Sequence, residues 1–239
     1  MEQPVETFTV EHHRTPVTVR VFTSAPHVLK FLLGQTPSAP FKFCMDIDDT
    51  VLHGSKTRPL GFSLTQELVK RGGEPIFVTA REGATAKTDA AWRDTFFALY
   101  EAGLHPTVTA KKNGVMMFKP PSNYSRMSEG AKDEAVENFK EQQRKSARPL
   151  WMACGDCLWD GIPTLGETNK WHLRPALNHK LFTKAYFVFG DAGKIVPGGC
   201  HSQWFLLLPN KFSKRLLETG PLVNKTVELL GSIKPSKKS

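Results

Sequence analysis

The sequence predicts an α/β fold with a central parallel sheet and helices on both faces. From residue 41 onward, short apolar runs such as PIFVT and LWMAC alternate with longer amphipathic stretches. Short apolar runs bounded by turn signals are typical of buried strands, and the intervening stretches are long enough for helices. A strand–helix–strand–helix order favours parallel strands with the helices packed on both faces of the sheet.

The first 40 residues read differently from the rest of the chain. Residues 5–22 alternate apolar and polar side chains, which predicts a β-hairpin or edge strands. A short helix is expected over residues 24–33, with Ser24 as its N-cap and Gly34 as its stop, followed by a linker at 35–40. We therefore expect an N-terminal extension over residues 1–40, a core over 41–231 and a disordered basic tail over 232–239.

The expected strands and helices of the core follow from the same patterns. Strands are predicted at residues 41–47, 75–79, 106–109, 150–154, 185–189 and 203–208. Helices are predicted at residues 63–71, 83–101 and 128–145, the last as a charged surface helix, with further helices at the C-terminus. The intervals between these elements leave no room for a large second domain. A small hairpin at 111–127 and a long loop at 161–184 are the expected substrate-facing segments.

The net charge and the hydropathy of the chain indicate which kinds of molecule the protein can bind. The net charge is +9 and the pI is about 9.4, which favours anionic partners such as nucleotides, nucleic acid or phosphorylated surfaces. No apolar run approaches the ~18 residues of a membrane helix, and the acidic N-terminus has no apolar signal region. We expect a cytoplasmic protein without a membrane partner; the sequence leaves its oligomeric state open.

Four cysteines do not indicate a disulfide framework in a chain of 239 residues. Cys154 and Cys157 form a CxxC pair, but no second pair completes a four-ligand zinc site. A reduced, partly buried pair is the expected state.

The segment DIDDT carries the strongest chemical signal. Asp46 and Asp48 directly follow an apolar run, and Thr50 follows them. Ligand sites in open α/β sheets lie beyond the carboxyl ends of the strands. Two acids at this spacing suit phosphoryl transfer, because one can attack phosphorus while the other moves a proton.

Other predicted strands end in polar residues of matching kinds. Thr79 and Arg81 follow the second strand, and Asp156 and Asp160 follow the strand at 150–154. Lys132 lies between them, at the start of the charged helix.

These motifs, in this order, resemble those of the haloacid dehalogenase superfamily of aspartate-based phosphatases. The DIDDTVL, FVTAR and WFLLLPN segments are most similar to the class B and C nonspecific acid phosphatases and 5′-nucleotidases. The resemblance implies a Rossmann-like core without a large cap domain, an aspartyl-phosphate intermediate, and a Mg²⁺ cofactor.

The resemblance also implies a role for each residue. Asp46 would be the nucleophile and Asp48 the acid and base. Mg²⁺ would be held by Asp46, Asp156 and the backbone carbonyl of Asp48, with Asp160 ligating through water or orienting the lysine.

The remaining roles concern the phosphoryl group. Thr79 would donate a hydrogen bond to it, and Lys132, with Lys111, Lys112 and Lys119 as rivals, would neutralise charge. Thr50 would contact substrate or support the loop backbone. Arg81 would either clamp the phosphate or pair with Glu82 or Asp94.

The function predicted from these residues is Mg²⁺-dependent hydrolysis of a phosphomonoester, most simply a nucleotide. Two alternatives stay open at this point: a phosphatase of nucleic-acid ends or phosphoproteins, and a non-catalytic phosphate- or nucleic-acid-binding protein on the same fold.

Overall fold

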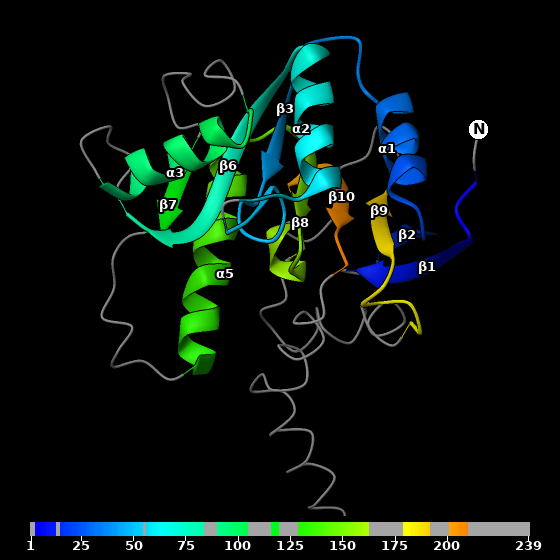
Figure 1. Cartoon of the computed structure of the whole chain (residues 1–239). Coiled ribbons are helices and arrows are strands. Elements are labelled where there is room, and N and C mark those ends of the chain that lie inside the picture. Colours follow the sequence, from blue (N-terminus) through cyan, green and yellow to red (C-terminus); the bar gives the residue numbers. More distant parts are fainter. Residues whose placement is uncertain are drawn as a thin grey trace, which may run out of the picture.

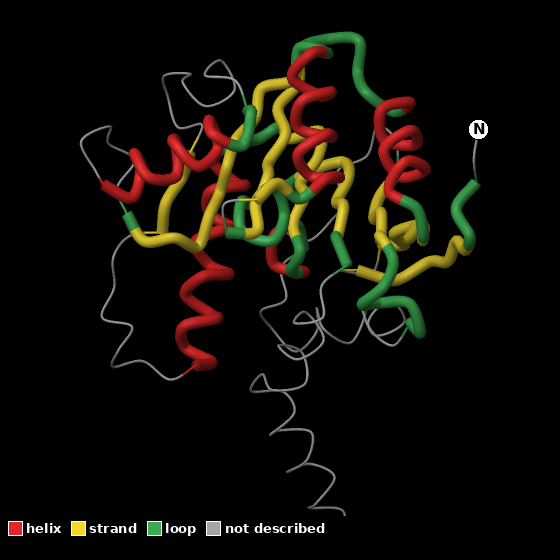
Figure 2. The backbone as a smooth tube through the Cα atoms, viewed as in Figure 1, coloured by secondary structure: helices red, strands yellow, loops and turns green. Residues whose placement is uncertain are grey.

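The computed structural model describes residues 3–12, 15–54, 56–83, 90–104, 116–119, 129–162, 179–191 and 201–209. The fold is α/β, as predicted, and eight strands of the described chain form one mixed sheet in the order β1-β2-β9-β10-β8-β3-β6-β7 (Figure 1). Figure 2 traces these strands in yellow, with the helices in red around them.

The centre of the sheet is parallel. Strand β3 (Phe41–Met45) pairs with β6 (Gly73–Glu82) on one side and with β8 (Leu150–Gly155) on the other. Two further parallel strands flank this trio: β7 (Met116–Lys119) lies beside β6, and β10 (Ser202–Leu207) lies beside β8. Side chains of β8 are buried along its whole length, as expected for a strand covered on both faces.

The other edge of the sheet is antiparallel. Strand β9 (Tyr186–Gly190) pairs with β10, and the hairpin of β1 (Glu6–His12) and β2 (Thr15–Phe22) continues from it through β2. The hairpin predicted for the N-terminus is therefore present, and it extends the main sheet.

Two apolar cores lie on the two faces of the sheet. Helices α1 (Ala25–Gly34), α2 (Pro59–Lys70) and α3 (Ala90–Glu101) pack on one face, where Leu32, Leu64 and Leu99 meet strand residues such as Phe43 and Phe77. Helix α5 (Glu129–Ser146) covers the other face. Alternate strand residues supply the two cores, because successive side chains of a strand point to opposite faces.

Several predicted elements differ from the structure or lie outside the described residues. The stretch expected to form a hairpin at 111–127 instead contains β7, which adds a parallel strand to the sheet. The predicted strand at 106–109, most of the loop at 161–184, and the C-terminal helices and tail lie outside the described residues. No helix among the described residues is long and apolar enough to cross a membrane.

The strand order determines where a ligand can bind. The chain runs outward from β3 through β6 to β7, and then crosses to β8 on the opposite side of β3. The direction of winding thus reverses at β3, and the crevice beyond the carboxyl ends of β3 and β8 is the expected ligand site of such a sheet.

Candidate active site

The loop that follows β3 coils tightly around one carbonyl group. The backbone N–H groups of Thr50, Val51 and Leu52 all donate to the carbonyl oxygen of Ile47, at 3.3, 2.9 and 2.9 Å. Asp49 adopts a left-handed conformation with φ of 57°, and the short hairpin of β4 (Leu52–His53) and β5 (Lys56–Thr57) follows. This coil holds Asp46 and Asp48 at the edge of the sheet.

Helix α2 braces the loop at Gly61. A Cβ atom at this position would lie 2.0 Å from the carbonyl oxygen of Thr50, so the helix can approach this closely only with glycine there.

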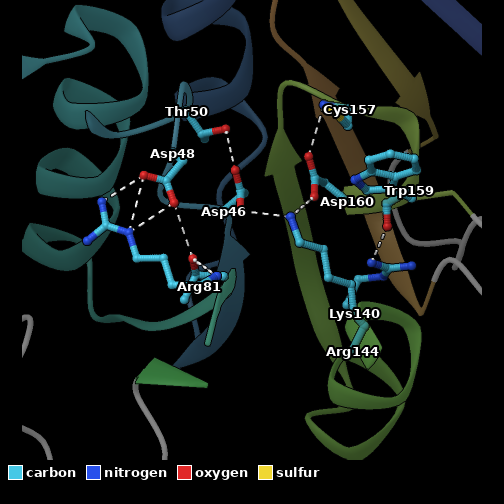
Figure 3. Close-up of polar contacts among 10 residues, drawn as sticks. Asp46, Asp48, Thr50, Arg81, Lys140, Arg144, Cys157, Trp159 and Asp160 are labelled. Atoms are coloured by element: carbon cyan, nitrogen blue, oxygen red, sulfur yellow. Dashed lines mark hydrogen bonds and ion pairs between the residues drawn. The ribbon is translucent and has the colours of Figure 1, made fainter. Parts of the chain in front are cut away.

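Asp46 is the buried carboxylate of the site. Its backbone N–H donates to the carbonyl of Cys154 at 2.9 Å, which ties the end of β3 to the end of β8. Its Oδ1 accepts a hydrogen bond from Lys140 Nζ at 2.8 Å, and its Oδ2 accepts one from Thr50 Oγ1 at 3.3 Å (Figure 3). Thr50 is fully buried and supports Asp46 through this hydrogen bond.

The lysine that the structure places beside Asp46 and Asp160 is Lys140, a residue that was not among those predicted from the sequence, in place of Lys132. Lys140 Nζ lies 2.8 Å from Asp46 Oδ1 and 2.5 Å from Asp160 Oδ1, and its side chain is almost entirely buried. Both lysines belong to α5, eight residues apart, which separates them by about 12 Å along a helix axis. The structure describes neither Lys111 nor Lys112. It also does not describe the side chains of Lys119 and Lys132.

Asp160 holds Lys140 in place. Its Oδ1 accepts from Lys140, and its Oδ2 accepts from the backbone N–H of Cys157 at 2.9 Å. A Cβ atom on Gly155 would lie 2.1 Å from Asp160 Oδ2, so the end of β8 must be glycine for Asp160 to fit. Of the two roles predicted for Asp160, the orienting role matches these contacts.

Asp156 lies beside Asp160 and Cys157 after the end of β8. One ligand atom from each of these three residues lies within 4.8 Å of the others, and Asp156 is 7 % exposed. Cys44, Cys154 and Cys157 are free thiols, and burial raises the pKa of all three.

Asp48 is the exposed acid, with half of its side chain open to solvent. Arg81 donates hydrogen bonds to its carboxylate through two nitrogens: Nη2 lies 2.7 Å from Oδ1, and Nε lies 3.0 Å from Oδ2. Thr79 Oγ1 donates to Asp48 Oδ2 at 3.4 Å and accepts from the backbone N–H of Arg81 at 3.1 Å. In this structure Arg81 pairs with Asp48, whereas its predicted roles were to clamp the phosphate or to pair with Glu82 or Asp94.

Negative charge is in excess among the buried groups of the site, which are Asp46, Asp156, Asp160 and Lys140. Burial raises the pKa of the Asp46 carboxyl; Lys140 opposes this, and Asp160 and Asp156 add to it. For Lys140, burial favours the neutral amine, but the carboxylates of Asp160 and Asp46 outweigh it and raise its pKa. When all are ionised, three carboxylates face one ammonium, leaving two negative charges that a divalent cation would neutralise.

The structure thus brings six of the eight predicted site residues to one strand edge: Asp46, Asp48, Thr79, Arg81, Asp156 and Asp160. Thr50 supports Asp46 from a buried position, and Lys140, in place of the predicted Lys132, contacts Asp46 and Asp160. Figure 3 shows the two halves, with Asp46, Asp48 and Arg81 on one side and Asp160 on the other, joined through Lys140.

The face of helix α5 that packs on the sheet carries charged side chains, Lys140 among them. Its buried positions are Glu137, Lys140 and Arg144, at helical spacing, so the helix turns charged side chains inward. The helix predicted at 128–145 as a charged surface helix thus buries part of its charge, while most of its described side chains are exposed or partly exposed. Arg144 Nη1 donates to the carbonyl of Trp159 at 2.6 Å, which satisfies part of this buried charge. A helix that packs on a sheet with charged groups on its buried face needs hydrogen-bonding partners for those groups.

The comparisons with known proteins add no assignment: no protein-family model matches the chain, and the search of curated proteins returns no match.

Proposed function

We propose that this protein is a Mg²⁺-dependent phosphomonoester hydrolase of the haloacid dehalogenase type, working through an aspartyl-phosphate on Asp46. The observation that carries the proposal is the ammonium of Lys140, which joins buried Asp46 to Asp160 at the strand edge that also carries Asp48. A carboxylate nucleophile, a fixed cation and a second, exposed acid are the groups that phosphoryl transfer through a covalent intermediate requires.

The sheet supports the finer fold assignment. The first strand of the core, β3, is central, with β6 and β7 on one side and β8 and β10 on the other, and all five are parallel. The predicted motif acids follow β3 and β8, and Thr79 and Arg81 lie near the carboxyl end of β6, beside β3. Between Thr50 and Thr79 the chain forms the β4–β5 hairpin and α2, in keeping with the absence of a large cap in that interval.

In the first step, an oxygen of Asp46 attacks the phosphorus atom of the substrate. The new bond joins Asp46 to phosphorus, the bond from phosphorus to the ester oxygen breaks, and Asp48 gives a proton to the departing alcohol. Lys140 and Thr79 stabilise the charge on the transferring group. The half-exposed side chain of Asp48 suits contact with a leaving group that approaches from solvent.

In the second step, Asp48 accepts a proton from a water molecule, whose oxygen forms a bond to phosphorus. The bond from phosphorus to Asp46 breaks, which releases orthophosphate and restores the carboxylate. Asp48 thus returns to its starting protonation state, and the cycle is complete.

The residues present fit a Mg²⁺ ion, which prefers oxygen ligands. Asp46, Asp156 and the backbone carbonyl of Asp48 would hold it, while Asp160 orients Lys140 through the hydrogen bonds that its two oxygens accept from Lys140 and Cys157. When bound, the ion supplies positive charge that polarises the phosphoryl group. The excess of two negative charges among the buried groups is what such an ion would balance.

The proposed substrate is a nucleotide or another phosphomonoester with a substantial leaving group. The net charge of +9 favours an anionic leaving group, so phosphorylated ends of nucleic acids belong in the same test.

The proposal is tested by measuring phosphate release with Mg²⁺ and with EDTA. The substrates are p-nitrophenyl phosphate, a nucleotide panel, phosphorylated oligonucleotides and a phosphopeptide. We expect Mg²⁺-dependent release that Asp46→Asn abolishes and Asp49→Asn retains. Asp49 is a matched control, since it pairs with His53 and Arg58 and its left-handed backbone suits asparagine. Salt-sensitive binding of nucleic acid without any release would indicate a binding protein instead.

A further inference from the structure

Helix α3 reaches the candidate site through one buried hydroxyl group. Thr95 is 1 % exposed, and its Oγ1 accepts a hydrogen bond from Nη1 of Arg81 at 3.0 Å. The two other nitrogens of the same guanidinium, Nε and Nη2, donate to Asp48. Arg81 therefore has Asp48 on one edge of its planar group and Thr95 on another.

This arrangement fixes the orientation of Arg81. A guanidinium is planar, so a contact at Nη1 determines which way the edge formed by Nε and Nη2 points. The side chain of Thr95 is buried, and β-branching leaves it few χ1 states, so its hydroxyl is a restricted anchor. Formation of the ion pair with Asp48 favours the charged form of Arg81 and raises its pKa, although burial opposes this.

Asp48 needs such support because it is the more exposed partner. Half of its side chain is open to solvent, whereas that of Arg81 is 28 % exposed. An exposed ion pair alone holds a carboxylate loosely, because solvent screens it and side-chain entropy opposes it. A bidentate contact whose arginine is itself anchored costs less entropy to form.

We propose that Thr95 is a positioning residue, which sets Arg81 so that it holds Asp48 in the orientation needed for proton transfer. The inference rests on the phosphatase activity proposed above, and it adds to that site a residue from α3 that touches neither the substrate nor the metal.

The variants that test this are Thr95→Val, which keeps the shape and removes the hydroxyl, and Thr95→Ser, which keeps the hydroxyl. Thr65→Val is the matched control: Thr65 is also a buried helical threonine, but its hydroxyl donates to the carbonyl of Gly61 at 2.7 Å in α2. Thermal melting of each variant establishes that it is folded.

We expect Thr95→Val to lower kcat roughly tenfold to a hundredfold with KM little changed, the size of effect that misplacing a reacting group produces. Thr95→Ser should restore kcat to within about twofold of wild type, and Thr65→Val should leave it unchanged. In an Arg81→Met background, Thr95→Val should have no further effect, since the two residues act through one contact.

A second readout needs no activity. The Nε–H signal of Arg81 in ¹H–¹⁵N spectra, assigned by its loss in Arg81→Met, should broaden or shift in Thr95→Val and remain in Thr95→Ser. An inactive wild type would overturn the phosphatase proposal, while this signal would still decide whether Thr95 positions Arg81. The inference is overturned if Thr95→Val leaves that signal unchanged. It is also overturned if an active enzyme loses as much activity with Thr65→Val as with Thr95→Val, or if Thr95→Val still lowers kcat when Arg81 is methionine.

Discussion

Lys140 Nζ lies 2.8 Å from Asp46 Oδ1, although 94 residues separate the two along the chain. The contact joins the end of the central strand to a helix on the far side of the sheet. It is made between buried groups, with both side chains no more than 6 % exposed. Such an ion pair requires full hydrogen bonding, and Asp160 and Thr50 supply the additional partners.

Replacing Lys140 by methionine should therefore harm both stability and activity. Two buried carboxylates would lose their shared cation, which costs about 3–5 kcal/mol when a buried pair is broken. Turnover should fall roughly a hundredfold or more, as when one donor to a developing charge is removed. Urea unfolding and kcat measure the two effects.

Lys132→Met is the matched control for that experiment, since the same substitution is made two turns earlier in the same helix. We expect its activity to stay within about twofold of wild type, because Lys140 already supplies the ammonium that contacts Asp46 and Asp160. A large loss with Lys132→Met and none with Lys140→Met would reverse our assignment of the lysine.

Gly155→Ala should disturb the site locally. The new methyl group would lie 2.1 Å from Asp160 Oδ2, so Asp160 must move and release Lys140. We expect a destabilisation of about 1–3 kcal/mol from overpacking, together with a clear loss of phosphate release.

Gly34→Ala provides the comparison, because a Cβ atom at Gly34 would meet no atom within 4 Å. That variant should be neutral, or more stable by about 0.4–1 kcal/mol. Equal behaviour of the two alanine variants would show that Asp160 does not depend on the glycine.

Mg²⁺ should raise the melting temperature of the wild-type protein. A ligand that binds only the folded state stabilises it by about 2.7 kcal/mol at a hundredfold excess over its Kd. Asp156→Asn should weaken this response. Asp191→Asn should retain it, because Asp191 pairs with Arg20 at the antiparallel edge of the sheet. An identical response in Asp156→Asn and wild type would remove Asp156 from the metal site.

His201 should make the protein less stable in acid. Burial, with the nearby charges of Arg148, Arg144 and Lys145, lowers the pKa of His201 from 6.5 to about 4. The unfolded chain then binds more protons between these values, so the stability that neutral His201 contributes is lost as pH falls from about 6.5 to 4.

His201→Asn tests this, since asparagine does not titrate and tolerates the left-handed φ of 61°. Between pH 7 and 4, wild type should lose about 1–2 kcal/mol more unfolding free energy than the variant, allowing for solvent screening at exposed Arg148. Parallel pH profiles of the two proteins would contradict the assignment of this loss to His201.

Local patterns predicted β3, β6, β8, β9 and β10 because each contains a short apolar run bounded by polar or turn residues, whereas β7 was not predicted. The acids after β3 and β8 were found for the same reason, since a strand end needs no knowledge of distant contacts. The boundaries were less predictable: β6 runs three residues beyond the apolar segment at 75–79, to Glu82, because β7 offers it a partner.

The lysine could not be assigned from local pattern alone. Val136 lies four residues from both Lys132 and Lys140, so the two lysines share one side of a helix, and only the register of α5 against β3 and β8 selects Lys140. Thr95 could not be predicted from the sequence for a related reason. Its proposed role in positioning Arg81 depends on how α3 packs near the end of β6, and a single threonine in a helix carries no sequence signal for such a contact.

The central claim is that Asp46 is the nucleophile, and trapping its phosphorylated form tests this most directly. Wild-type protein would be quenched in acid during turnover with Mg²⁺ and substrate, and its peptides analysed by mass spectrometry. We predict the added mass of one phosphoryl group on the peptide that contains Asp46, and its absence in Asp46→Asn and in EDTA. Turnover that continues in Asp46→Asn, or a phosphoryl group found on a different residue, would contradict the mechanism.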